Sequence, residues 1–306
     1  MSISSRQIAV LKPLRRYGYL RTNQIRDLVI PHDETGSITR SVMRKLVALR
    51  LVRRHDAKLV DENGSTPPTY VLTHEGSSVL VAHCNDPSLL LDVEPKFTDW
   101  MSLNHYCGLS SFHILLDRAI AAQSAVTLQK LYFEHEVIRP NALDPAQKYR
   151  LYTVVADQPR IIAVPDSAFE TEFLGSRRAW YVERETGSDN PARVAAKKAK
   201  GYALLSENSL HRRHFPDVDD FRVLALCPSP GWRDALRREM KDKPVPTSGS
   251  CFPDRDQNRH RSAWSDLVQG GSGPISLILN PVQNQTTLTP HPLLQEVPHS
   301  IRQPVR

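Results

Sequence analysis

The chain has 306 residues, with 40 Lys and Arg against 33 Asp and Glu, which gives a formal net charge of +7. Thirteen of the basic residues and four of the acidic residues fall within residues 1–58, so this segment carries +9 and the remainder −2. A hydrophobic fraction of 40% is enough for folded cores and excludes a wholly disordered chain. No run approaches the ~20 apolar residues of a membrane span. Basic charge confined to one small segment is typical of a nucleic-acid-binding unit.

The four cysteines, Cys84, Cys107, Cys227 and Cys251, contain no CxxC pair and form no Cys/His pattern of a zinc site. The amino-terminal residues lack an apolar core of signal-peptide length, and their apolar positions are spaced as on a helix face. We therefore expect reduced thiols in a cytoplasmic protein, with no membrane association.

Three helices are predicted in the basic segment. The first ends near Gly18, the second covers residues 23–30 with Thr22 as its N-cap, and the third begins after Ser37. The third helix is expected to bury an apolar stripe made of Ile38, Val42, Leu46 and Leu49.

The other faces of the third helix carry polar and basic residues, as in a helix that enters a DNA groove. Arg40 and Arg44 are one turn apart and point the same way. The candidate DNA-binding residues on this helix are Thr39, Arg40, Ser41, Arg44 and Lys45.

A basic hairpin is predicted next, from residues 51–60 through a turn at 61–64 to a return strand at 69–72. Another helix follows, with Thr73 as its cap. This order predicts a winged helix-turn-helix domain over residues 1–85, whose wing presents Arg53, Arg54 and Lys58 to phosphates. The alternative is a small helical domain with a solvated basic face.

Residues 99–122 are predicted to form one long helix. Its histidines, His105 and His113, are expected to be packed or hydrogen-bonded rather than metal-bound, because neither has a second ligand at i+4. The positions expected to be buried are Leu103, Cys107, Phe112, Leu115, Leu116 and Ala119.

Strands and helices alternate in the remainder of residues 96–242, which predicts an α/β domain with a central sheet in a chain of class α+β overall. Helices are predicted over residues 191–205 and 231–240. The predicted strands cover residues 126–135, 149–155, 161–169, 178–185 and 221–227.

Two of these strands carry acidic residues at their ends, Asp166 and Glu183. On adjacent strands their carboxylates can converge and hold one Mg²⁺, a cation that prefers oxygen ligands and can activate water against a phosphodiester. Lys198 and Tyr202 are one turn apart on the following helix and can approach a phosphate. No cofactor is required by the sequence, and Mg²⁺ is expected only if this site is a nuclease.

The order of these motifs resembles the replication-relaxation proteins of plasmids and integrative elements. In that family a winged-helix start is followed by a histidine-containing helix, a V-P-D strand, a strand close to E-T-G and a helix with K-x-x-x-Y. The resemblance extends from about residue 6 to residue 240. The matching segments are residues 19–25, 51–54, 70–73, 164–166, 182–187 and 198–202.

The resemblance implies binding of double-stranded DNA in mobile-element replication or DNA relaxation, and a second domain similar to the PD-(D/E)xK nuclease-like fold. Such a nuclease places a lysine where this chain has Glu185, so Lys198 would have to replace it. We therefore expect a relic site. The alternatives are a Mg²⁺-dependent nuclease or nickase that uses Asp166, Glu183, Glu185, Lys198 and Tyr202, and a transcription regulator.

Residues 243–306 are rich in Pro, Ser, Gln, Asn and Thr and are expected to form a mostly flexible tail. Within this tail Ile275–Leu279 is the exception, as one strand or docked segment. Other replication or mobilisation proteins are candidate partners, and the sequence leaves a homodimer open.

Overall fold

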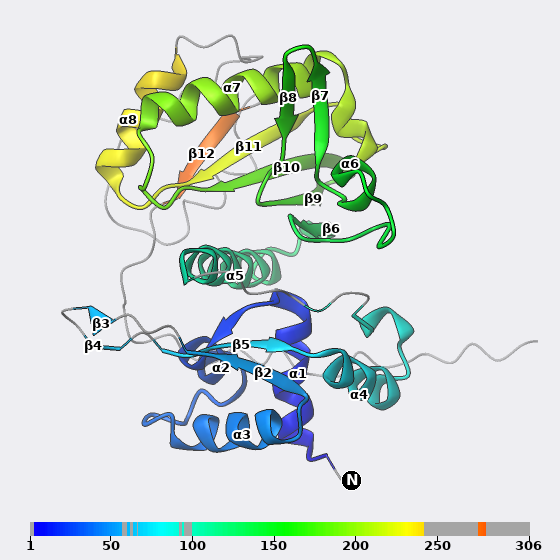
Figure 1. The fold of residues 1–306 in the computed structure, drawn as a ribbon, viewed down its shortest axis with the longest axis vertical. Coiled ribbons are helices and arrows are strands. Elements are labelled where there is room, and N and C mark those ends of the chain that lie inside the picture. The colour runs from blue at the N-terminus through cyan, green and yellow to red at the C-terminus, as the bar shows by residue number, and fades with distance from the viewer. Residues whose placement is uncertain are drawn as a thin grey trace, which may run out of the picture.

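The computed structural model describes residues 3–56, 60–61, 64–65, 67–91, 94, 100–241 and 275–279. It is a mixed α+β structure. Helix α5, Trp100–Ala121, lies between an amino-terminal unit (α1 to α4) and a sheet unit (β6 to β12), as Figure 1 shows. None of the helices in these ranges is both long and apolar enough to cross a membrane.

The three predicted helices of the amino-terminal unit are α1 (Ser5–Tyr17), α2 (Thr22–Val29) and α3 (Ser37–Ala48). Helix α1 ends where expected, at Gly18, whose φ of 78° suits glycine. The prediction for Thr22 was wrong: it is the first helical residue, and Arg21 is the N-cap. The Arg21 backbone N–H is satisfied by Gln24 Oε1 at 2.8 Å.

The buried face of α3 differs from the predicted stripe. Val42 and Leu46 are buried as expected, but Ile38 is 43% exposed. Thr39 and Met43 take its place, so the inward positions are 39, 42, 43 and 46, the i, i+3, i+4, i+7 pattern of one helix face. The helix is rotated by about one residue from the expected orientation.

A three-stranded antiparallel sheet completes the amino-terminal unit, in the order β1 (Leu20–Arg21), β5 (Thr69–Leu72), β2 (Val52–His55). The predicted pairing of residues 51–60 with 69–72 is therefore confirmed for β2 and β5. Strands β3 (Val60–Asp61) and β4 (Gly64–Ser65), which lie between β2 and β5 in the sequence, pair with each other. Helix α4, His74–Cys84, is capped by Thr73, whose hydroxyl accepts the Gly76 N–H at 3.0 Å.

The sheet unit is built on a five-stranded sheet in the order β12-β11-β10-β9-β6. Strands β6 (Val126–Phe133), β9 (Ser167–Phe173) and β10 (Ser176–Arg184) are antiparallel neighbours. Strand β11 (Phe221–Leu226) runs parallel to β10, and β12 (Ile275–Leu279) runs parallel to β11. The edge strand β12 thus comes from the stretch that was expected to be mostly flexible.

One predicted strand, residues 161–169, is two strands in the structure. Strand β8 (Arg160–Ala163) pairs with β7 (Thr153–Asp157) in a hairpin of its own, whereas β9 begins at Ser167 in the main sheet. Residues 164–166 form the break, because Pro165 has no N–H to donate to a central ladder. Short helix α6, Pro145–Lys148, precedes the hairpin.

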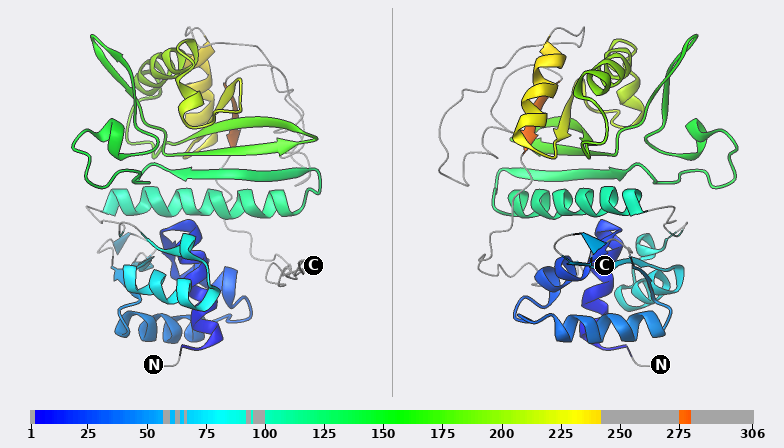
Figure 2. Two further views of the ribbon diagram at one scale, coloured as in Figure 1. Left: turned by 90° about the vertical axis from the view of Figure 1, so that its right-hand side faces the viewer. Right: turned by 60° about the vertical axis from the view of Figure 1, so that its left-hand side comes forward.

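Helices cover both faces of the sheet (Figure 2). Helix α5 packs on one face, where Trp180 and Val182 of β10 join its core. Helices α7 (Pro191–Glu207) and α8 (Pro230–Lys241) lie on the other face, where Ala179 and Tyr181 point. The alternation along β10 follows from the two-residue period of a strand.

Helix α5 contributes to the cores of both units. Ile114 joins the core of the amino-terminal unit, while Phe112 and Leu116 join the core beneath the sheet. Leu115 was expected to be buried but is 46% exposed. A helix buried on two opposite sides has a narrow polar stripe between them, and Leu115 lies on that stripe.

Candidate functional site

Four arginine side chains line one hollow of about 690 Å³ on the amino-terminal unit. Arg26 comes from α2, Arg40 and Arg44 from α3, and Arg54 from β2. The other residues that line it are Thr22, Asn23, Thr35, Gly36, Ser37, Pro67, Pro68 and Tyr70. Guanidinium groups converge here from three elements that are separate in the sequence.

Two of these arginines are already paired. Arg26 binds Asp27 at 2.8 Å and Arg54 binds Asp56 at 2.7 Å. Arg40 and Arg44 form no ion pair with the side chains that the structure describes. The hollow therefore offers two uncompensated guanidinium groups, the planar donors that best match phosphates and guanine edges.

Gly36 shapes the hollow where α3 begins. It caps the helix with a φ of 70°, a left-handed conformation that favours glycine. A Cβ on this residue would lie 3.0 Å from Arg40 Nη1. The Arg40 side chain is thus folded back over the first turn of α3.

The structure separates the residues that were predicted to bind DNA. Arg40, Arg44 and Arg54 line the hollow, whereas Ser41 and Lys45 are not among its lining residues. Arg53 precedes Arg54 on β2, so its side chain points to the opposite face of the strand. Its Nη1 lies 3.4 Å from Glu94 Oε2, and it does not line the hollow. Lys58 lies outside the described residues.

The prediction that Thr39 contacts DNA was wrong. It is fully buried, and its backbone N–H and hydroxyl both donate to Asp33 Oδ2, at 2.7 and 2.8 Å. Burial raises the pKa of Asp33, but the hydrogen bonds from Thr39 outweigh burial and the pKa is lowered overall. Thr39 therefore anchors the start of α3 and cannot reach a groove. Arg26 was not predicted to bind DNA. It joins the hollow because α2 packs beside α3.

A second candidate site surrounds Asp166, which follows the break before β9. Its backbone N–H donates to the Val182 carbonyl at 3.0 Å, and its Oδ2 accepts the Arg184 N–H at 2.5 Å. Its own carbonyl accepts the Glu134 N–H at 3.1 Å. The Asp166 backbone is thus tied to β10 and to the end of β6, and its carboxylate is tied to β10.

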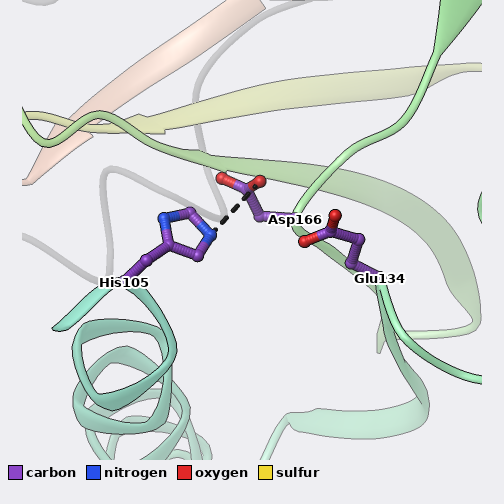
Figure 3. A group of neighbouring side chains, drawn as sticks. All are labelled: His105, Glu134 and Asp166. Atoms are coloured by element: carbon purple, nitrogen blue, oxygen red, sulfur yellow. Dashed lines mark ion pairs between the residues drawn. The ribbon is translucent and has the colours of Figure 1, made fainter. Parts of the chain in front are cut away.

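His105, Glu134 and Asp166 form a group that we call the His–Glu–Asp cluster (Figure 3). Each offers one ligand atom, and these atoms all lie within 4.8 Å of one another. His105 Nε2 is 3.4 Å from Asp166 Oδ1. Burial lowers the pKa of His105, but Asp166 outweighs it and raises the pKa overall; burial and the charge of Asp166 raise the pKa of Glu134.

Glu183 forms a separate buried group with Lys198 and Tyr202. Lys198 Nζ lies 2.5 Å from Glu183 Oε2, and the Tyr202 hydroxyl donates to Oε1 at 2.6 Å. Burial raises the pKa of Glu183, while Lys198 and Tyr202 oppose that rise. Both carboxylate oxygens are therefore engaged within the protein.

The predicted sharing of one cation by Asp166 and Glu183 stays a prediction. Asp166 directly precedes β9 and Glu183 lies on the neighbouring strand β10, where burial and the charge of Asp166 raise the pKa of Glu183. The described group of three possible metal ligands that contains Asp166 is completed by His105 and Glu134. Lys198 and Tyr202 were expected to reach a phosphate and instead hold Glu183. Glu185 is half-buried beside them, and burial raises its pKa.

Comparison with known proteins gives one extended match. A family model described as replication-relaxation matches residues 11–218, more than half of the chain. No curated protein matches the chain.

Two solved structures resemble parts of the model weakly. One is titled "Mechanism for regulation of DNA binding of Bordetella bronchiseptica BpsR by 6-hydroxynicotinic acid", with 16% identity, a TM-score of 0.22, and coverage of 40% of this chain and 78% of that chain. The other is the restriction endonuclease FokI, with 13% identity, a TM-score of 0.28, and coverage of 79% of this chain and 40% of that chain. At these TM-scores neither likeness establishes the fold.

Proposed function

The chain belongs to the replication-relaxation family, and we propose that it binds double-stranded DNA of a plasmid or integrative element during replication, through its amino-terminal unit. The observation that supports this most is the convergence of Arg26, Arg40, Arg44 and Arg54 on one hollow. A concentration of positive charge on one concave surface attracts the DNA backbone.

The order of elements supports a winged helix-turn-helix interpretation of this unit. Helices α1, α2 and α3 precede the β2–β5 hairpin, and α4 follows it. In such a domain the third helix enters the major groove and the hairpin contacts the flanking backbone. Helix α3 would then present Arg40 and Arg44 to the groove, and β2 would present Arg54 to a phosphate.

The ion pairs of the four arginines suggest which of them contribute most to DNA affinity. Arg40 and Arg44 carry no acidic partner among the described residues, so they can form bidentate hydrogen bonds with guanine or phosphate without breaking an ion pair. Arg26 and Arg54 must exchange Asp27 and Asp56 for DNA. We therefore assign most of the affinity to the α3 arginines.

We propose that the sheet unit is a nuclease-like platform that binds DNA or a partner protein. Its order of α5, three antiparallel strands, α7 and a parallel strand is the arrangement expected for a PD-(D/E)xK-like domain. Cleavage would require Asp166 and Glu183 to share a cation, but Lys198 and Tyr202 occupy both oxygens of Glu183. Glu185 adds negative charge where a lysine is needed. These contacts favour binding over nicking.

The test uses the full-length chain and a fluorescently labelled duplex. The double variant Arg40→Ala/Arg44→Ala should bind more weakly than the wild type. The control is Arg193→Ala, which removes an exposed arginine of α7 on the far side of the sheet and should bind like the wild type. Equal binding by all three proteins would contradict the proposal. Incubation of supercoiled plasmid with Mg²⁺ tests the nickase alternative separately.

A further inference from the structure

The His–Glu–Asp cluster is assembled from three elements that meet at one end of the sheet. His105 lies on α5, Glu134 directly follows β6, and Asp166 directly precedes β9 (Figure 3). One imidazole nitrogen and two carboxylate oxygens within 4.8 Å of one another are a complete set of protein ligands for a metal ion with open positions.

Backbone hydrogen bonds fix the main chains of the two acidic residues, and one of them also fixes the Asp166 carboxylate. Glu134 N–H donates to the Asp166 carbonyl at 3.1 Å, so the two residues are fixed to one another at adjoining strand ends. Asp166 is fixed in turn by Val182 and Arg184 of β10. A site whose ligands are already positioned loses little entropy when it binds an ion.

The charges of the cluster are incompletely compensated. Within the described part of the chain, the Glu134 carboxylate has no hydrogen-bond or ion-pair partner, although it is half-buried. The basic groups that act electrostatically on Glu134 are already engaged: His105 lies 3.4 Å from Asp166, and Lys198 binds Glu183. The Glu134 carboxylate is therefore the member of the cluster whose negative charge no direct ion pair compensates within the described residues.

There is also space beside the cluster. Asp166 lines a hollow of about 10 Å³ together with aromatic residues that include Tyr106 and His135. This is close to the smallest volume that holds one water molecule. Asp166 is the member of the cluster that lines this hollow, so the space for a water molecule lies beside its carboxylate.

We propose that His105, Glu134 and Asp166 bind one divalent transition-metal ion, which ties α5 to the ends of β6 and β9. Because α5 also contacts the amino-terminal unit, the ion would stiffen the connection between the two units. This inference does not depend on DNA binding, since the site lies on the sheet unit and uses none of the arginines of the hollow.

The ligand set selects the class of metal. Mg²⁺ prefers oxygen ligands and near-ideal octahedral geometry, so a site with an imidazole ligand is poorly suited to it. Imidazole together with carboxylates suits Mn²⁺ and Zn²⁺, with Zn²⁺ the tighter of the two. Mn²⁺ is the most useful probe because the sharp paramagnetic signal of the free ion is lost on binding, so the bound ions are counted by difference.

The experiment measures Mn²⁺ binding to the full-length chain by electron paramagnetic resonance, with Mg²⁺ titrated in parallel by calorimetry. We expect one bound Mn²⁺ per chain, an affinity for Mg²⁺ at least ~10-fold weaker, and a melting temperature that rises with Mn²⁺ concentration. Glu134→Gln and His105→Asn should each lower Mn²⁺ affinity at least ~10-fold. Glu207→Gln, which alters an exposed acid at the end of α7, should leave binding unchanged.

Folding of each variant is checked by its metal-free melting curve. Glu134→Gln is the decisive variant, because the Glu134 side chain has no described partner to lose and the substitution keeps its shape. Absence of saturable Mn²⁺ binding would overturn the proposal. Retention of the bound ion in a folded Glu134→Gln protein, or tighter binding of Mg²⁺ than of Mn²⁺, would also overturn it.

Discussion

Arg16 of α1 and Asp117 of α5 form a two-point ion pair, with Nε and Nη2 at 2.9 and 2.6 Å from the two carboxylate oxygens. Tyr17 donates a third hydrogen bond to the same carboxylate at 2.8 Å. Bidentate, charge-assisted bonds of this kind fix orientation as well as distance. Together with the Gln24–Ser111 bond at 2.8 Å, they attach the amino-terminal unit to α5.

Asp117→Ala should therefore lower the free energy of unfolding by about 1–2 kcal/mol, because it leaves Arg16 and Tyr17 without their acceptor. The estimate is modest because the Arg16 side chain is 47% exposed and water screens the pair. Chemical denaturation measures the change. Asp219→Ala, which breaks the exposed pair with Arg212, is the matched control and should change stability by less than ~0.5 kcal/mol. Equal losses for both variants would show that the α1–α5 contact is an ordinary surface pair.

Thr39→Val should lower stability by about 1 kcal/mol, because it removes a buried hydroxyl donor and leaves an oxygen of Asp33 short of one hydrogen bond. The size and shape of the side chain are kept. DNA affinity measured well below the melting temperature should match the wild type, since Thr39 cannot reach the hollow. A loss of affinity with unchanged stability would mean that Thr39 contacts DNA after all.

His214 links stability to pH. It is buried, with the Tyr181 hydroxyl 2.7 Å from Nδ1 and the Thr153 hydroxyl 3.2 Å from Nε2, and burial lowers its pKa to about 4. A lowered pKa means that the unfolded chain binds the proton more readily than the folded chain. The stability that neutral His214 contributes is therefore complete above pH ~6.5 and falls as the pH drops toward 4.

His214→Gln should consequently be most destabilising near pH 8, and the difference from the wild type should shrink as the pH falls from ~6.5 to ~4. Denaturant unfolding at several pH values provides the measurement. A difference that stays constant over this range would show that His214 keeps an ordinary pKa in the folded protein. Glu207→Gln serves as the control without a buried imidazole.

Removal of residues 243–306 should lower the melting temperature, because β12 is hydrogen-bonded along β11 from Val223 to Leu226. Truncation would leave that edge of β11 unpaired. The comparison is a shorter truncation, of residues 281–306, which keeps β12 and should melt closer to the wild type. If both truncations melt like the full chain, β12 contributes nothing to the stability of the sheet.

Much of this fold follows from local sequence pattern. Helices α1, α3, α5 and α7 were predicted close to their observed bounds, because each has helical spacing and a clear start or stop. The break at Pro165 was missed, although Pro165 and Asp166 interrupt the apolar run, because residues 161–169 were treated as one strand. The exposure of Ile38 was also missed, because the orientation of α3 depends on which neighbouring surface it packs against.

In the candidate sites, too, some features could be predicted from local sequence and others depend on tertiary packing. Asp166 was identified because an acid beside a strand end is visible in the sequence. His105 was expected to be packed or hydrogen-bonded rather than metal-bound, and Glu134 was not singled out. The three members are 29 and 32 residues apart along the chain, and only the packing of α5 on the sheet brings them together. The sequence also placed Glu183 and Lys198 in reach of one another, but could not show that they would bind each other rather than a ligand.

DNA binding by Arg40 and Arg44 on α3 should be visible in how the affinity for a duplex depends on salt concentration. The logarithm of the association constant for a duplex, plotted against the logarithm of salt concentration, has a slope of about −0.9 for each phosphate contact. We expect Arg40→Ala/Arg44→Ala to lower the affinity and to make this slope shallower by roughly one to two units, according to whether one or both arginines contact phosphates. A double variant with the wild-type affinity and slope would contradict it.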